Sequence, residues 1–169
     1  MKRIIKAVIA PLIILSCLSG RCQNNDLDSI ESTSILLKNQ SIELAAGTES
    51  TPTKIVTVFG NPTKISSEIS EVDGQTYLYY KYLYDRFYFI DNRLEYIELK
   101  SNQFYIICKG HNIKVGDDIA LLSSVFPDSF LAKKERRILI GLKHSGIITD
   151  SFLVISYNDS NRISEIVIQ

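Results

Sequence analysis

The sequence is poor in the residues that carry most enzyme and metal chemistry. Among 169 residues there are two histidines, three cysteines and no tryptophan. A zinc site needs three or four ligands at recognisable spacing, and Cys108-x-x-His111 is a single pair. There is no Gly-x-Ser-x-Gly elbow and no glycine-rich phosphate loop. We therefore expect no catalytic residues, no metal and no cofactor; a hydrolase with an unrecognised site ranks third among our interpretations.

The few cysteines also exclude a disulfide scaffold. Cys108 lies in the apolar run FYIIC, where a thiol behaves as a small buried hydrophobe. If Cys17 is lipidated, Cys22 and Cys108 are left to pair; cleavage before Gln23 leaves Cys108 alone. Both alternatives stay open at this point.

Long hydrophobic runs are missing as well. The longest uncharged stretch, between Lys6 and Arg21, has 14 residues, whereas a membrane-spanning helix needs about 20. The basic start and short apolar run are typical of a secretory signal peptide, here residues 1–22. We therefore expect an exported protein without a transmembrane anchor.

Two kinds of processing fit this leader. Ile14-Leu15-Ser16-Cys17 resembles the bacterial lipobox, which implies lipidation of Cys17 and anchoring to the outer membrane. Ordinary cleavage before Gln23 would instead give a periplasmic or secreted protein. A lipid anchor on Cys17 is the only contact with the membrane that we expect.

The chain has no excess of positive charge. It contains 19 basic and 19 acidic residues, but four of the basic ones lie in the leader, so the remainder has a net charge of about −4. Nucleic-acid binding depends on clustered Lys and Arg that neutralise phosphates. We therefore expect no nucleic-acid partner.

Two short helices are marked by their end signals. The first is expected over Pro52–Phe59, with a Ser50 or Thr51 cap and a stop at Gly60. The second is expected over Asp118–Phe126, after a cap at Gly116-Asp117 and before a stop at Pro127. Each has a single apolar stripe, so each must cover another element.

Each helix is followed by strands with similar turns. Residues 87–99 contain two alternating strands joined by Asp91-Asn92, and residues 152–168 contain two joined by a longer turn over 158–161. Further strands are expected at 63–69, 76–84, 103–109 and 137–143. After a flexible tether at 23–34, this predicts an α+β protein with short helices packed on one face of an antiparallel sheet. It also predicts two related helix-plus-meander units, 35–109 and 110–169.

The Gly-Asp-Asp-Ile-x-x-Leu-x-x-x-Phe-Pro pattern at 116–127, its weaker copy at 47–62 and the strand NRLEYIEL at 92–99 resemble the SmpA/OmlA (BamE-like) class of small envelope lipoproteins. They are also similar to the tandem form of that fold in the β-lactamase inhibitor protein. The resemblance covers roughly residues 41–169 and implies a helix cap on a small antiparallel sheet and a non-catalytic role in protein contact. No binding residue carries over from it.

Tyrosine is concentrated in one region, since eight of the nine lie between Tyr77 and Tyr105. Because strand side chains alternate between faces, Phe87, Phe89, Ile97 and Leu99 suit the core. The outward row is then a candidate protein-binding face, because tyrosine offers contact area and a polar tip. This row consists of Tyr77, Tyr79, Lys81, Tyr88, Tyr96 and Glu98. Ordinary cross-strand pairing is the alternative explanation.

These observations favour a non-enzymatic protein of the bacterial cell envelope that acts as a protein-binding scaffold or assembly factor. Its partner would be another envelope protein. The second interpretation is a secreted inhibitor or ligand-binding module that uses the tyrosine-rich face.

Overall fold

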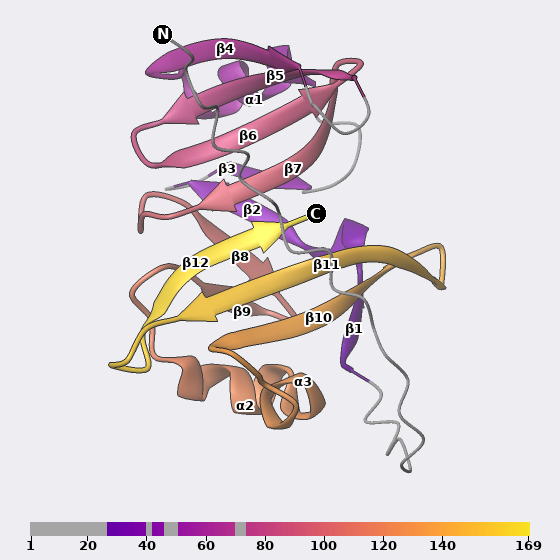
Figure 1. Cartoon of the computed structure of the whole chain (residues 1–169), viewed down its shortest axis with the longest axis vertical. Helices are drawn as coiled ribbons and strands as arrows, with labels where there is room; N and C mark the ends of the chain where they lie inside the picture. The colour runs from indigo at the N-terminus through magenta and orange to yellow at the C-terminus, as the bar shows by residue number, and fades with distance from the viewer. Residues whose placement is uncertain (1–26, 40–41, 46–50, 70–73) are drawn as a thin grey trace, which may run out of the picture.

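The computed structural model describes residues 27–39, 42–45, 51–69 and 74–169. Two β-sheets lie in layers, and the short helices pack beside the smaller sheet (Figure 1). The α+β class is confirmed, with strands predominating. The expected leader, Cys17 and the first part of the tether lie outside the described residues.

The large sheet has eight strands in the order β1-β10-β11-β12-β7-β6-β5-β4. Its bounds are β1 Ser29–Glu31, β4 Lys64–Ile69, β5 Thr76–Tyr82, β6 Asp85–Ile90, β7 Arg93–Leu99, β10 Arg137–His144, β11 Ile147–Tyr157 and β12 Ile163–Ile168. Seven strands form antiparallel pairs, while β1 runs parallel to β10. The sheet is therefore mixed, and our expectation of a wholly antiparallel sheet was wrong.

The small sheet has four strands in the order β3-β2-β8-β9. It consists of two hairpins, β2 Leu36–Asn39 with β3 Ile42–Ala45 and β8 Tyr105–Cys108 with β9 His111–Ile113. The hairpins pair through β2 and β8, where Leu37 lies opposite Ile106. The sequence did not indicate a second sheet, because these strands are too short to show a clear alternation.

The expected tether was wrong from Asp28 onward. Ser29–Glu31 form β1, and Ser32–Ser34 form a 3₁₀ turn, η1. The backbone N–H of Asp28 donates to the Ser129 hydroxyl and the N–H of Ser129 donates to the Asp28 carboxylate, both at 3.0 Å. Tertiary hydrogen bonds therefore order a segment whose composition alone is typical of a flexible chain.

The first helix was predicted correctly, because α1 spans Pro52–Phe59. The Thr51 hydroxyl accepts from the N–H of Lys54 at 3.3 Å, and Gly60 ends the helix with φ 78°. A positive φ favours glycine because it has no Cβ.

The second helix is divided into three pieces: η2 Ile119–Leu121, α2 Leu122–Val125 and α3 Pro127–Leu131. The cap is Asp118, whose carboxylate accepts from the N–H of Ala120 at 2.9 Å, and not the expected Asp117. Pro127 does end α2, but it also begins α3, because proline is well suited to the first position of a helix.

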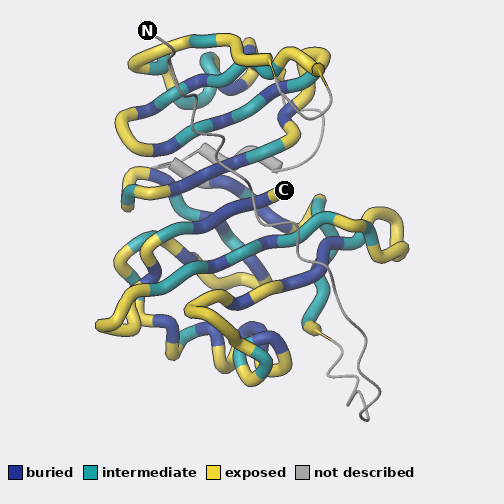
Figure 2. The backbone as a smooth tube through the Cα atoms, in the orientation of Figure 1, coloured by how far each residue is buried: buried dark blue, intermediate teal, exposed yellow. Residues whose placement is uncertain are grey.

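The core lies between the two layers (Figure 2). Along β6, buried and half-buried residues alternate, so one face of the large sheet packs inward. Phe59 of α1 stacks on Phe87 at 6.0 Å between ring centroids, and Tyr82 and Phe104 complete this aromatic cluster. The other face of the large sheet, which we name the outward face, has no described helix or strand in front of β4 to β7 (Figure 1).

Candidate functional site

Three tyrosines lie side by side on the outward face and form what we name the tyrosine ladder: Tyr79 of β5, Tyr88 of β6 and Tyr96 of β7. The strand registers pair them directly. The ring centroids of Tyr79 and Tyr88 are 5.5 Å apart, and those of Tyr88 and Tyr96 are 5.1 Å apart at an interplanar angle of 81°. All three side chains are half-buried.

A β-bulge aligns the ladder. The register of β6 and β7 shifts between Tyr88 and Phe89, which leaves Glu95 without a directly paired residue. Because of this extra residue, Leu94 and Ile97 are both buried although they are three positions apart, and Tyr96 returns to the outward face. The spacing of Leu94 and Ile97 is the sequence signal that indicates the bulge.

The remaining predicted members of the face differ in their surroundings. Tyr77 and Lys81 are half-buried on β5, on either side of Tyr79. Glu98 lies in the outward row opposite Arg86, as its position predicts, but it is only 8% exposed. It is held by neighbouring cations, so it is not an open contact group.

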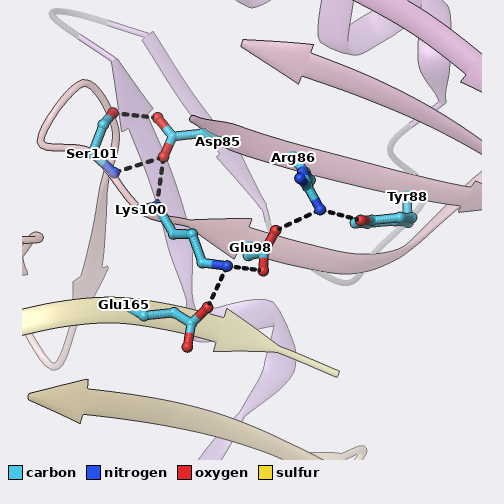
Figure 3. Close-up of polar contacts among 7 residues, drawn as sticks. All are labelled: Asp85, Arg86, Tyr88, Glu98, Lys100, Ser101 and Glu165. Atoms are coloured by element: carbon cyan, nitrogen blue, oxygen red, sulfur yellow. Dashed lines mark hydrogen bonds and ion pairs between the residues drawn. The ribbon is translucent and has the colours of Figure 1, made fainter. Parts of the chain in front are cut away.

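Glu98 belongs to a charge cluster that comprises Arg86, Glu98, Lys100 and Glu165 (Figure 3). The Lys100 ammonium donates to Glu98 at 2.6 Å and lies 3.1 Å from Glu165 on β12. Arg86 lies 3.5 Å from the second Glu98 oxygen, which has no hydrogen-bond partner. This cluster joins β6, β7 and β12, and the sequence analysis identified only Glu98 in it.

The charge cluster also affects the ladder. Arg86 donates to the Tyr88 hydroxyl at 3.3 Å, a hydrogen bond that raises the pKa of Arg86. Hydrogen bonding to Glu98 raises the pKa of Lys100. Burial, and then the negative charge of Glu98, raise the pKa of Tyr96. Tyr96 is therefore a neutral hydrogen-bonding group at physiological pH.

Asp85 faces inward at the start of β6 and has a structural role (Figure 3). It is fully buried, and it accepts from the N–H groups of Lys100 and Ser101 at 2.7 and 2.9 Å and from the Ser101 hydroxyl at 2.5 Å. These bonds satisfy a buried charge and fix the turn after β7.

A pocket of about 490 Å³ lies beside the ladder, with lining residues from β4, β5, β6 and β7, and we name it the corner pocket. The sequence analysis identified three of its residues, Tyr77, Tyr88 and Tyr96. Its volume is within the range of small-molecule and side-chain pockets. The described residues that line it are Glu68, Ile69, Tyr77, Tyr88, Ile90, Glu95, Tyr96 and Gln169.

The residues that sequence reasoning weighed for chemistry lie apart from this face. Cys108 is buried and unpaired, and burial raises the pKa of its thiol to about 12, so it is a poor nucleophile. His111 and His144 are exposed at strand ends. Within the described ranges, no group of three His, Cys, Asp or Glu side chains could hold a metal ion.

In the described part of the chain, no helix is long and apolar enough to cross a membrane.

The outward face combines a row of aromatic rings, a charge cluster and an open pocket. This arrangement can bind a partner through apolar contact and hydrogen bonds.

In comparisons with known proteins, no family model, curated protein or solved structure matches this chain.

Proposed function

We propose that this protein is an exported, non-enzymatic binding protein of the cell envelope that holds another protein against its tyrosine ladder. The observation that carries the proposal is the uninterrupted contact of Tyr79, Tyr88 and Tyr96 across three strands. Tyrosine is enriched in binding hot spots, because a rigid ring offers large contact area at low entropic cost and its hydroxyl can still hydrogen-bond. A scaffold or assembly factor would use such a face.

Capture of partners from an envelope extract tests this function. Tyr88→Ala should weaken partner retention by roughly tenfold or more, since truncating a central hot spot costs about 1–2 kcal/mol or more. The matched control is Tyr84→Ala, because Tyr84 is 69% exposed in the turn after β5 and lies outside the ladder. Equal retention by Tyr88→Ala and the wild-type protein would exclude the ladder as the binding face.

The export part of the proposal rests on the leader and on Cys17. Globomycin treatment or a Cys17→Ala change should block processing and acyl labelling if the protein is a lipoprotein. A mature protein with a free N-terminal Gln23 would show that it is periplasmic or secreted instead. A secreted inhibitor or ligand-binding module remains the second candidate, and the corner pocket favours it.

We also infer that the fold consists of two related units, as in the tandem form of the envelope lipoprotein fold. The central pair of each sheet supports this: Leu37 lies opposite Ile106, and Glu98 lies opposite Val167. In both pairs the partners are 69 positions apart. If one internal two-fold axis relates the halves, the pair at the centre of each sheet joins equivalent residues, so both pairs must have the same separation.

Other features repeat at the same interval. The hairpin pairs Asn39–Ile42 and Cys108–His111 are 69 positions apart, as are the positive-φ turn residues Asn92 and Asn161. The halves differ in their fourth strand, which is antiparallel β4 in one and parallel β1 in the other. An experimental structure tests the inference. One rotation should superpose β2 and β7 on β8 and β12; separate rotations for the two sheets would overturn it.

A further inference from the structure

The lining of the corner pocket carries charge of one sign. Among the described residues that line it, Glu68 and Glu95 carry the carboxylate side chains, and none is a Lys or Arg. A pocket that is negative and aromatic attracts cations. This combination distinguishes the pocket from the rest of the outward face, where the charge cluster already pairs its own cations with carboxylates.

The cations near the pocket are engaged or easily displaced. Arg86 donates to the Tyr88 hydroxyl and contacts Glu98, so its charge points toward the charge cluster. Arg93 lies 3.8 Å from Glu95, but the two side chains are 74% and 44% exposed. Exposed ion pairs of this kind contribute about 0–1 kcal/mol, so a cation bound in the pocket can replace Arg93.

Two aromatic rings of the pocket lining meet nearly at a right angle. Tyr88 and Tyr96 both line it, and their ring planes are nearly perpendicular at 81°. Both rings are half-buried, which reduces the water that competes for a bound charge. Ile69 and Ile90 add aliphatic surface to the lining, which suits the methylene stem of a long side chain.

We propose that the corner pocket binds a cationic side chain, arginine or lysine, that the protein partner presents beside the tyrosine ladder. This inference rests on the proposed function and names the chemistry of its partner. The lining supplies a counter-charge from Glu68 and Glu95, aromatic rings for the cation and an apolar wall for its stem. Tyr88 belongs to both the ladder and the pocket, so one partner segment can occupy both.

The test uses N-acetyl-arginine amide and its uncharged isostere N-acetyl-citrulline amide as probes for the purified protein. Because the chain has no tryptophan, binding can be followed by tyrosine fluorescence, to which the three tyrosines of the lining contribute. NMR chemical shifts locate the bound probe. We expect the arginine amide to saturate the protein at roughly 1–10 mM. The citrulline amide should bind about tenfold more weakly or not at all, because it lacks the charge.

Pocket variants have matched controls outside the pocket. The double change Glu68→Gln and Glu95→Gln should weaken arginine binding about five- to tenfold while keeping the side-chain volumes. Glu135→Gln, at an exposed position outside the lining, should leave binding unchanged. Urea midpoints and circular dichroism verify that all variants are folded.

Equal binding of the two probes, no saturable binding of arginine, or wild-type affinity of the double variant would each overturn this inference. The proposed function can fail separately, because partner capture is measured with Tyr88→Ala and Tyr84→Ala. Capture that depends on Tyr88 without any preference for a charged probe would leave the binding face intact and exclude the cation pocket alone.

Discussion

The two meanders of the large sheet, β5–β7 and β10–β12, have similar inward faces and different outward faces. Their bulges lie at matching places, between Tyr88 and Phe89 and between Ser156 and Tyr157. With the bulges aligned, three matched inward positions are aromatic or aliphatic in both: Tyr80, Phe87 and Ile97 in the first meander, and Ile138, Ile155 and Ile166 in the second. Asp85 is the buried polar exception in the first meander.

At the aligned positions of the outward face, the two meanders carry side chains of different kinds. The tyrosine ladder of the first meander corresponds to Arg137, Ser156 and Glu165 in the second. The row of Lys81, Arg86 and Glu98 corresponds to Leu139, Val154 and Val167. Burial favours apolar side chains at the inward positions, and Asp85 is accommodated there because three hydrogen bonds satisfy its carboxyl group. The outward positions can differ without loss of the core. The outward face of the first meander is therefore where we place function.

The largest effects should come from the inward positions, in both meanders alike. Phe87→Ala should lower the free energy of unfolding by about 3–5 kcal/mol and Ile155→Ala by about 2–5 kcal/mol, because each removes a fully buried side chain and leaves a cavity. Urea denaturation of the two variants measures both losses. A loss below about 1 kcal/mol in one meander only would break the comparison.

High pH should destabilise the protein through two buried groups, Tyr82 and Cys108. Burial raises the pKa of Tyr82 and of Cys108 to about 12, from ordinary values of 10.0 and 9.0. The unfolded chain therefore loses these protons at lower pH than the folded protein, so stability is complete below about pH 9 and falls as the pH rises toward 12.

The expected loss is about 4 kcal/mol between pH 8 and pH 11, measured from urea midpoints, with the larger share from Cys108. Tyr82→Phe should flatten the decline, although it also removes the hydrogen bond from the Tyr82 hydroxyl to the Gly60 carbonyl at 2.8 Å. The counterpart of Tyr82 in the second meander is Ile140, which does not titrate. An unchanged slope in Tyr82→Phe would show that other groups cause the decline.

Outward truncations should cost less than inward ones. Tyr88→Ala should lower stability by about 1 kcal/mol, because it removes two ring contacts from a half-buried position. Its counterpart Ser156→Ala should change stability by about 0.5 kcal/mol or less. A loss of about 3 kcal/mol in Tyr88→Ala would mean that the ladder belongs to the core and is not a binding face.

The smallest effect should come from making the first meander resemble the second. Glu98→Val places a valine opposite Val167, and it removes a carboxylate that is 8% exposed. The cations that remain, Arg86 and Lys100, are 41% and 45% exposed and stay hydrated without Glu98, so stability should change by less than about 1 kcal/mol. Salt titration separates the contributions: the wild-type protein should lose more stability at high salt than Glu98→Val does.

Short-range signals in the sequence predicted the local elements well. Thr51, Pro52 and Gly60 delimit α1, and Asp91-Asn92 mark the β6–β7 turn, where both residues have positive φ. Such signals suffice because they act through hydrogen bonds and steric limits within a few residues. The alternation of β5 and β6 likewise indicated which tyrosines face outward, although it could not show which of them touch.

Only the tertiary structure decided the second sheet, the ordering of β1 and the corner pocket. The strand β1 is ordered by β10 and by Ser129, about a hundred positions away in the sequence. Glu68 and Glu95 meet the tyrosines because β4, β5, β6 and β7 lie side by side in this order and a bulge shifts the register of β7. Local composition determined where strands and turns form. Long-range backbone pairing decided which side chains share a surface, since register and bulges depend on the partner strand.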